Sequence, residues 1–150
     1  MTATRRQARE WAIQMLTAAD ANPPDDVDAF VEAHWPTVIE ASSEGGEEEK
    51  VKAKFKNFTE ERVRGVLANL EEIDSLLGSL LENWDVYRLG AVERSVLRMG
   101  LWELIHTDVP APVVINEAID LANWFSSPKS RAIINGVLDK FAKRSKGAEE

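Results

Sequence analysis

The stretch IINGVLDKF, residues 133–141, holds the one local pattern that argues for a strand, so its interpretation decides the fold class. Asn135-Gly136 lies between two apolar pairs, which is the strongest short-range signal for a β-hairpin. The apolar residues nevertheless recur at helical spacing as far as Phe141, and no other segment offers a strand to complete a sheet. We therefore expect a helix here, in which Gly136 allows a close helix crossing, and an all-α fold.

The segments that precede this stretch show the same helical spacing. Ser127-Pro128 is a suitable cap and first turn for the helix just described. Pro110 and Pro112 end one helix, whose apolar residues run from Val92 to Ile105, and set the start of the next. The C-terminal half is thus expected to contain three helices.

The N-terminal half has the same periodicity with more interruptions. A first helix of about 15 residues carries an apolar stripe and ends at Asn22-Pro23-Pro24-Asp25, because proline lacks the amide donor that a helix requires. A short second helix follows, capped by Asp25 or Asp26. Residues 36–49 are expected to form a mobile acidic loop. A long third helix is then expected, with Thr59 as its N-cap and Leu80 near its end.

The net charge of -8 argues at first against a nucleic-acid partner. Its distribution reverses that impression. Residues 20–49 hold ten acidic residues and no lysine or arginine, whereas the other 120 residues hold 16 acids and 18 bases. The cations gather near the two ends of the chain. Local charge therefore permits an RNA partner, while the acidic block is expected to be a solvated face and loop.

Catalytic chemistry finds no support in the sequence. There is no cysteine, no glycine-rich phosphate loop and no metal-binding motif, and His34 and His106 are expected to be structural. We expect no catalytic residue, no metal and no cofactor. No stretch is apolar enough to span a membrane, and Arg5-Arg6 is not followed by the apolar core of a signal peptide. We therefore expect a cytoplasmic protein that keeps its N-terminus and is not an enzyme.

Binding is the remaining class of function. Arg5 and Arg9 share one side of the first helix, at the edge of its apolar stripe, and Arg6 adds a third cation. Arginines in a first turn oppose the helix dipole, which favours a functional reason for their presence. Of the five tryptophans, most are expected in the core, and Trp124, close to Lys129 and Arg131, is the best candidate to stack on a base.

Several motifs together resemble the NusB family of bacterial transcription antitermination factors. The resemblance covers roughly residues 5–20 and 60–142. It rests on Arg5-Arg6-x-Ala8-Arg9-Glu10-x-Ala12, Asn83-Trp84-x-x-x-Arg88-Leu89, Val92-Glu93-Arg94-x-Val96-Leu97-Arg98, Asp108-Val109-Pro110, Val113-Val114-Ile115-Asn116-Glu117-Ala118-Ile119 and Asn135-Gly136-Val137-Leu138-Asp139-Lys140.

The resemblance implies a single NusB-like domain made of two packed helical bundles, with about six to seven helices. Its subdomains would be residues 1–82 and 83–143, followed by a flexible tail, 144–150. It also implies binding of boxA-type single-stranded RNA from ribosomal RNA transcripts together with NusE, a ribosomal small-subunit protein. The complex would then join NusA, NusG and RNA polymerase.

The family's functional positions map onto two sets of residues here. The RNA-binding set would be Arg5, Arg6, Arg9, Lys129, Ser130 and Arg131, and the set facing NusE or a second copy would be Leu16, Thr17 and Glu93. Two residues depart from the family's pattern: Lys129 stands where an acidic residue is common, and Thr17 where an aromatic is frequent. The alternative function is a homodimeric helical protein–protein interaction module without RNA binding.

Overall fold

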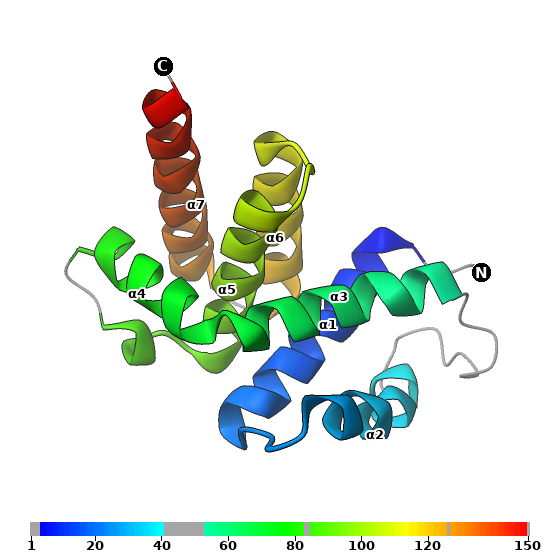
Figure 1. The fold of residues 1–150 in the computed structure, drawn as a ribbon. Coiled ribbons are helices and arrows are strands. Elements are labelled where there is room, and N and C mark those ends of the chain that lie inside the picture. The colour runs from blue at the N-terminus through cyan, green and yellow to red at the C-terminus, as the bar shows by residue number, and fades with distance from the viewer. Residues whose placement is uncertain (1–3, 41–52, 83–84, 126, 150) are drawn as a thin grey trace. The chain divides into compact units, whose positions relative to one another are not determined.

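The structure is a computed structural model that describes residues 4–40, 53–82, 85–125 and 127–149. Within these residues the chain forms seven α-helices and one 3₁₀ helix, and no strand, so the all-α prediction is confirmed (Figure 1). The elements are α1 (Arg5–Ala21), α2 (Val27–Glu40), α3 (Ala53–Ala68), α4 (Leu70–Leu80), η2 (Val86–Arg88), α5 (Ala91–His106), α6 (Ala111–Phe125) and α7 (Pro128–Glu149). They divide into two compact units, Met1–Ala68 and Asn69–Glu150.

The first unit consists of α1, α2 and α3, and α1 packs against both of the others. Thr4 caps α1, because its hydroxyl accepts a hydrogen bond from the backbone amide of Gln7 at 3.1 Å. Asp26 caps α2 in the same way through the amide of Ala29, also at 3.1 Å, as the sequence predicted. Both caps supply acceptors to amides that the first turn of a helix leaves unpaired.

Two tryptophans occupy the core of this unit. Trp11 and Trp35 are buried and meet edge to face, with ring centroids 5.6 Å apart. The Trp35 indole N–H donates to a carboxylate oxygen of Glu60 at 3.0 Å. Thr59 is also buried, inside α3, and its hydroxyl donates to the Ala8 carbonyl oxygen at 2.8 Å. The prediction of Thr59 as an N-cap is therefore wrong: the hydroxyl joins α3 to α1.

Pro36 does not end α2, which continues to Glu40. Residues 36–40 of the predicted acidic loop are therefore helical, and residues 41–49 of that loop lie outside the described residues. Proline inside a helix removes one backbone hydrogen bond. Val38 and Ile39 beyond it are buried, and the free energy of burying them offsets that loss.

The predicted third helix is two helices, α3 and α4, separated at Asn69. The division between the two units falls at the same place, after Ala68, whereas the family resemblance implied a division after residue 82. Apolar positions keep their helical spacing across Asn69, so periodicity alone did not reveal the break. A signal was nevertheless present, because asparagine followed by Glu71-Glu72 is a good helix start: asparagine favours the cap, and acids favour the first turn.

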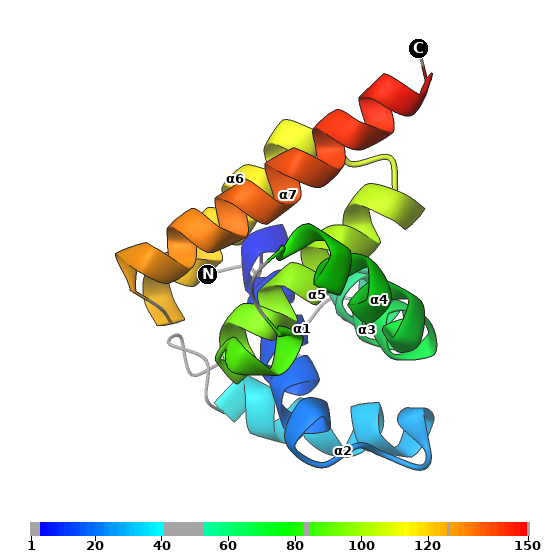
Figure 2. The ribbon, with the colours of Figure 1, turned by 90° about the vertical axis from the view of Figure 1, so that its left-hand side faces the viewer.

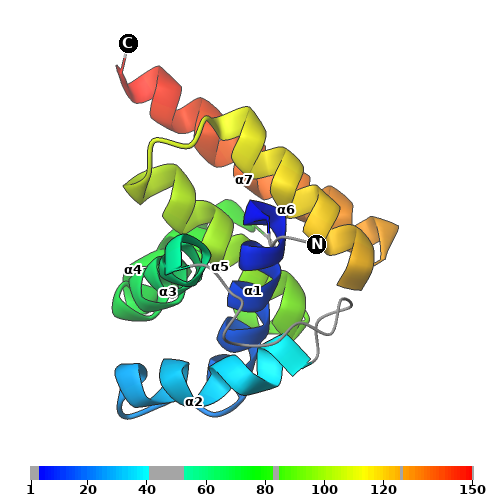
Figure 3. The same ribbon diagram turned by 90° about the vertical axis from the view of Figure 1, so that its right-hand side faces the viewer.

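The second unit contains α4, η2 and α5–α7. Helices α6 and α7 lie side by side and both pack on α5 (Figure 2, Figure 3). At Gly100 of α5, an added Cβ would lie 3.0 Å from a methyl carbon of Leu138 on α7, so the two helices approach closely there. An added Cβ at Gly136 would meet nothing within 4 Å. The prediction of a close crossing at Gly136 is therefore wrong, and the close approach of α5 and α7 is found at Gly100 instead.

Helix α7 settles the interpretation of the Asn135-Gly136 pair, since both residues are helical and the rejected hairpin does not form. The helix runs on to Glu149, through most of the segment expected to be a flexible tail. Of the tryptophans predicted to be in the core, Trp11, Trp35 and Trp102 are buried. Trp84 and the side chain of Trp124 lie outside what the structure describes.

Candidate nucleic-acid interface

The arginines predicted to bind RNA lie in the first two turns of α1 and differ in exposure. Arg5 and Arg6 are exposed, whereas Arg9 is 3% exposed, with its guanidinium 5.1 Å from the centroid of the Phe58 ring. Burial raises the pKa of the neighbouring Glu10, and the positive charge of Arg6 offsets part of that rise. Arg5 and Arg6 therefore lie on the surface of the first unit, while Arg9 is placed to join α1 to α3.

The second predicted RNA cluster forms the first turn of α7. The Ser127 hydroxyl accepts from the Ser130 amide at 3.3 Å, so Ser127 caps the helix, as the sequence predicted. Lys129 is exposed, and Ser130 and Arg131 are half-buried. This cluster belongs to the second unit and the α1 arginines to the first, so the structure describes each set within its own unit.

A cavity of about 150 Å³ adjoins the start of α7. Two residues of the predicted RNA-binding set, Lys129 and Ser130, line this cavity. Glu93 of the predicted partner set lines it too, so the structure brings residues of the two sets together. The full lining is Arg88, Leu89, Gly90, Glu93, Lys129, Ser130 and Ile133. Arg131 is not part of it.

Glu93 lies against the backbone of Gly90 at the start of α5. A Cβ at Gly90 would collide with the Glu93 carboxylate. Any residue other than glycine at position 90 would therefore displace this carboxylate. An acid in the first turn also interacts favourably with the helix dipole. Of the other two predicted partner residues, both in α1, Leu16 is buried and Thr17 is half-buried.

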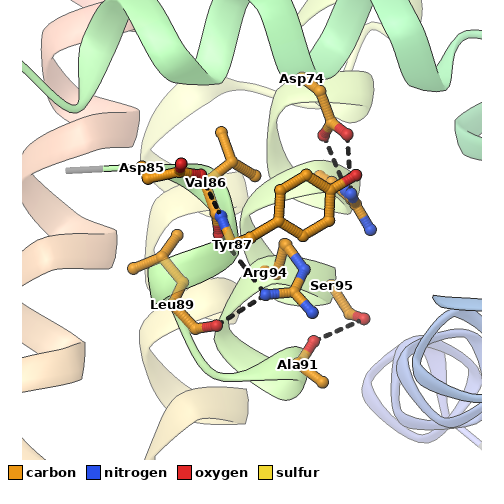
Figure 4. A network of polar contacts seen from close by, with 9 residues as sticks. Asp74, Asp85, Val86, Tyr87, Leu89, Ala91, Arg94 and Ser95 are labelled. Atoms are coloured by element: carbon orange, nitrogen blue, oxygen red, sulfur yellow. Dashed lines mark hydrogen bonds and ion pairs between the residues drawn. The ribbon is translucent and has the colours of Figure 1, made fainter. Parts of the chain in front are cut away.

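A polar network centred on Arg94 fixes the segment that forms one wall of this cavity (Figure 4). The guanidinium of Arg94 is buried and donates to the Leu89 carbonyl at 2.6 Å and to the Val86 carbonyl at 3.5 Å. It also lies 5.1 Å from the ring centroid of Tyr87, a side chain that is 69% exposed. Asp85 accepts from the Tyr87 amide at 2.8 Å, which caps η2. A three-residue helix has little stability of its own, so these bonds hold it in place.

Beside this network, Arg98 of α5 makes two hydrogen bonds to Asp74 of α4, at 2.8 and 2.7 Å. Arg98 is buried, so the pair is an ion pair partly removed from water that joins the two helices.

Sequence reasoning missed the roles of Arg88, Gly90 and Arg94 around the cavity. Arg94 was an informative signal, since a charged residue within an apolar helical pattern has to find buried acceptors. The acceptors of its hydrogen bonds are backbone carbonyls at the two ends of η2, which the sequence does not mark.

Comparison with known proteins decides the family. The sequence model of the NusB family matches residues 6–143. The chain belongs to the NusB family. A transcription antitermination protein NusB from a Nitratiruptor species is 37% identical over 148 residues, which cover 99% of this chain and 98% of that one. The NusB of Campylobacter jejuni subsp. jejuni serotype O:23/36 is 40% identical over 144 residues, covering 96% and 99%.

Solved structures show the same fold. NusB from T. maritima superposes with a TM-score of 0.77 at 31% identity, covering 95% of this chain and 93% of that one. A chain from the crystal structure of antitermination factors NusB and NusE in complex with dsRNA gives a TM-score of 0.74 at 25% identity, covering 93% and 96%.

The function of this NusB family member is that of a transcription antitermination factor. Among the residues that the structure describes, no group of three or more histidine or acidic side chains is placed to hold a metal ion. In the same residues no helix is both long and apolar enough to cross a membrane.

Proposed function

We propose that this chain binds boxA-type single-stranded RNA together with NusE and so acts in antitermination of ribosomal RNA transcription in the cytoplasm. The observation that carries the proposal is the exposure of both Arg5 and Arg6. The net charge of the chain is -8, so these two arginines place positive charge on the surface of an acidic protein. Guanidinium groups stay charged and make paired hydrogen bonds to phosphate oxygens. Lys129, Ser130 and Arg131 form the second part of the proposed RNA surface.

The partner side of the proposal rests on Thr17 and Glu93. Glu93 is a half-buried carboxylate beside Gly90, and a negative charge at this place favours a basic side chain on the partner. Leu16 is buried, so its proposed contribution is to shape the surface around Thr17. A NusB of known structure occurs in a complex with NusE and dsRNA, which supports the choice of partner. In the proposed larger assembly, this complex joins NusA, NusG and RNA polymerase.

A pair of matched double variants tests the RNA surface. Arg5→Ala with Arg6→Ala removes two exposed cations from α1, and Lys143→Ala with Arg144→Ala removes two exposed cations from the C-terminal part of α7. Fluorescence anisotropy with labelled boxA-type RNA and saturating NusE gives the affinity over a range of salt concentrations. Each phosphate contact contributes about -0.7 to the log–log salt slope for single strands.

We expect the Arg5/Arg6 variant to bind more weakly and with a salt slope about 1.4 smaller in magnitude, from two contacts at roughly 0.7 each. The Lys143/Arg144 variant should keep the slope of the unmodified protein. If both variants lose the same affinity and the same slope, net charge explains the binding and the assignment of Arg5 and Arg6 is wrong.

A further inference from the structure

Tyr87 is the most exposed large apolar side chain in the part of the chain that the structure describes. It lies on η2 and is 69% exposed, whereas Val113 and Ile105 are 43% and 38% exposed. A single exposed apolar side chain is common on protein surfaces and indicates nothing by itself. Tyr87 differs because buried groups hold the short segment that carries it.

The network of Figure 4 fixes both the backbone of η2 and the surroundings of the ring. Asp85 caps η2 by accepting from the Tyr87 amide at 2.8 Å. The buried guanidinium of Arg94 donates to the carbonyls of Val86 and Leu89, at the two ends of η2. The same guanidinium lies over the Tyr87 ring, 5.1 Å from its centroid. A group that is ordered before binding reduces the entropic cost of binding.

An exposed and ordered tyrosine suits a contact with another protein. Tyrosine supplies a large contact area and loses little side-chain freedom, because it has only two χ angles. It is also enriched among the residues that carry most of the binding energy of protein interfaces. The Arg94 cation already lies over the Tyr87 ring, and like charges repel, so a second cation on this ring is disfavoured. An apolar side chain is the better match.

The charge beside the ring favours a protein over RNA. Asp85 is exposed, and its carboxylate is bonded to the backbone of Tyr87 itself. The cations of Arg88 and Lys129 line the cavity with Glu93, and neither Asp85 nor Tyr87 is part of that lining. A carboxylate repels phosphate and attracts a basic side chain. The surface formed by Asp85 and Tyr87 therefore fits an apolar residue with a basic residue next to it.

We propose that Tyr87 is an anchor of the surface that binds NusE, with an apolar side chain of NusE on its ring and a basic one paired with Asp85. The proposal rests on the NusE binding proposed above and extends that surface from Glu93 to η2. Arg88 of η2 and Glu93 line the same cavity, so the two parts of the surface are continuous. Arg94 acts through Tyr87 and is a positioning residue.

Calorimetric titration of NusE into this chain, without RNA, measures the affinity on which the test depends. Tyr87→Ala removes the ring and Tyr87→Phe keeps it. Ile105→Ala is the matched control, because Ile105 is also an exposed apolar side chain of the second unit. Asp85→Asn removes the negative charge but keeps an oxygen that can accept from the Tyr87 amide.

We expect Tyr87→Ala to weaken NusE binding by about tenfold to a hundredfold, as the loss of a central interface aromatic commonly does. Tyr87→Phe and Ile105→Ala should bind as the unmodified protein does. Asp85→Asn should weaken binding by about threefold, and added salt should remove this difference.

A double-mutant cycle tests the positioning role of Arg94. Arg94→Lys keeps the charge but loses the paired geometry of the guanidinium. It should weaken NusE binding in the unmodified protein and have no further effect in Tyr87→Ala. Thermal unfolding shows which variants fold, and the comparison of Tyr87→Ala with Ile105→Ala provides the test if Arg94→Lys does not.

Equal affinities of Tyr87→Ala and Ile105→Ala for NusE would overturn the proposal, as would an equal loss in Tyr87→Phe and Tyr87→Ala. Fluorescence anisotropy with boxA-type RNA alone examines the other class of partner. If Tyr87→Ala weakens RNA binding and leaves NusE binding intact, the ring stacks on a base and the proposal is wrong. If the unmodified protein binds NusE neither with nor without RNA, the proposed function itself is wrong.

Discussion

Alanine at Gly100 and alanine at Gly136 should change the stability of the protein in opposite directions. Both glycines lie inside long helices, Gly100 in α5 and Gly136 in α7. Replacing glycine by alanine in a helix interior is favourable by about 1 kcal/mol, because glycine loses more backbone entropy on folding. This gain applies equally at both positions.

The surroundings of the two residues separate them. At Gly100 the new methyl group would lie 3.0 and 3.1 Å from two methyl carbons of Leu138, which is itself fully buried. Overpacking of this kind costs about 1–3 kcal/mol. The net effect of Gly100→Ala is then a destabilisation of roughly 0–2 kcal/mol. At Gly136 nothing lies within 4 Å, so the gain of about 1 kcal/mol remains whole.

Urea unfolding followed by circular dichroism measures both variants under the same conditions. The difference between them isolates the packing cost, since the helix propensity gain cancels, and we expect it to be about 1–3 kcal/mol. Equal stabilisation by both alanines would refute the reasoning, because it would mean that α5 and α7 do not approach closely at Gly100.

Two further predictions concern charged side chains. Arg9→Ala should lower the stability by about 1–3 kcal/mol, since the buried side chain packs on Phe58, whereas Arg5→Ala should leave the Tm unchanged; a calorimetric scan of each variant decides this. A hydrogen bond and the positive charge of Lys140 hold the pKa of Glu82 below its usual value, so the small stability from this pair is present at neutral pH and lost as the pH falls through that lowered pKa. Lys140→Met should raise the Glu82 pKa towards the ordinary glutamate range in an NMR titration, and an unchanged value would contradict the pairing.

The fold class and most helices could be predicted because they depend on period and on local caps. The apolar spacing around Asn135-Gly136 correctly outweighed a hairpin signal, since a hairpin needs a further strand to be stable. Asp26 and Ser127 were recognised as caps because a cap acts within its own first turn.

Features that depend on contacts between distant segments could not be predicted. Thr59 has the residue type of a cap, but its hydroxyl binds the Ala8 carbonyl in another helix. Pro36 has the residue type of a helix end, but the burial of Val38 and Ile39 keeps the helix going. In each case tertiary packing outweighed a correct local preference.

The candidate site was predictable in its residue types and only partly in its geometry. The resemblance placed Arg5 and Arg6 on a surface, and they are exposed. It placed Arg9 with them, although one more turn of the helix brings that side chain into the core. The cavity joins Glu93 to Lys129, which are far apart in the sequence, a proximity that arises only when α5 and α7 pack together.

The most direct test of the central claim is the mass of the complex in solution, measured by multi-angle light scattering on a mixture of this chain, NusE and boxA-type RNA. Our account predicts one species that contains one copy of each component and whose formation weakens as salt is added. A species of twice 16.8 kDa that persists in the presence of both NusE and RNA would contradict it and would favour a homodimeric interaction module.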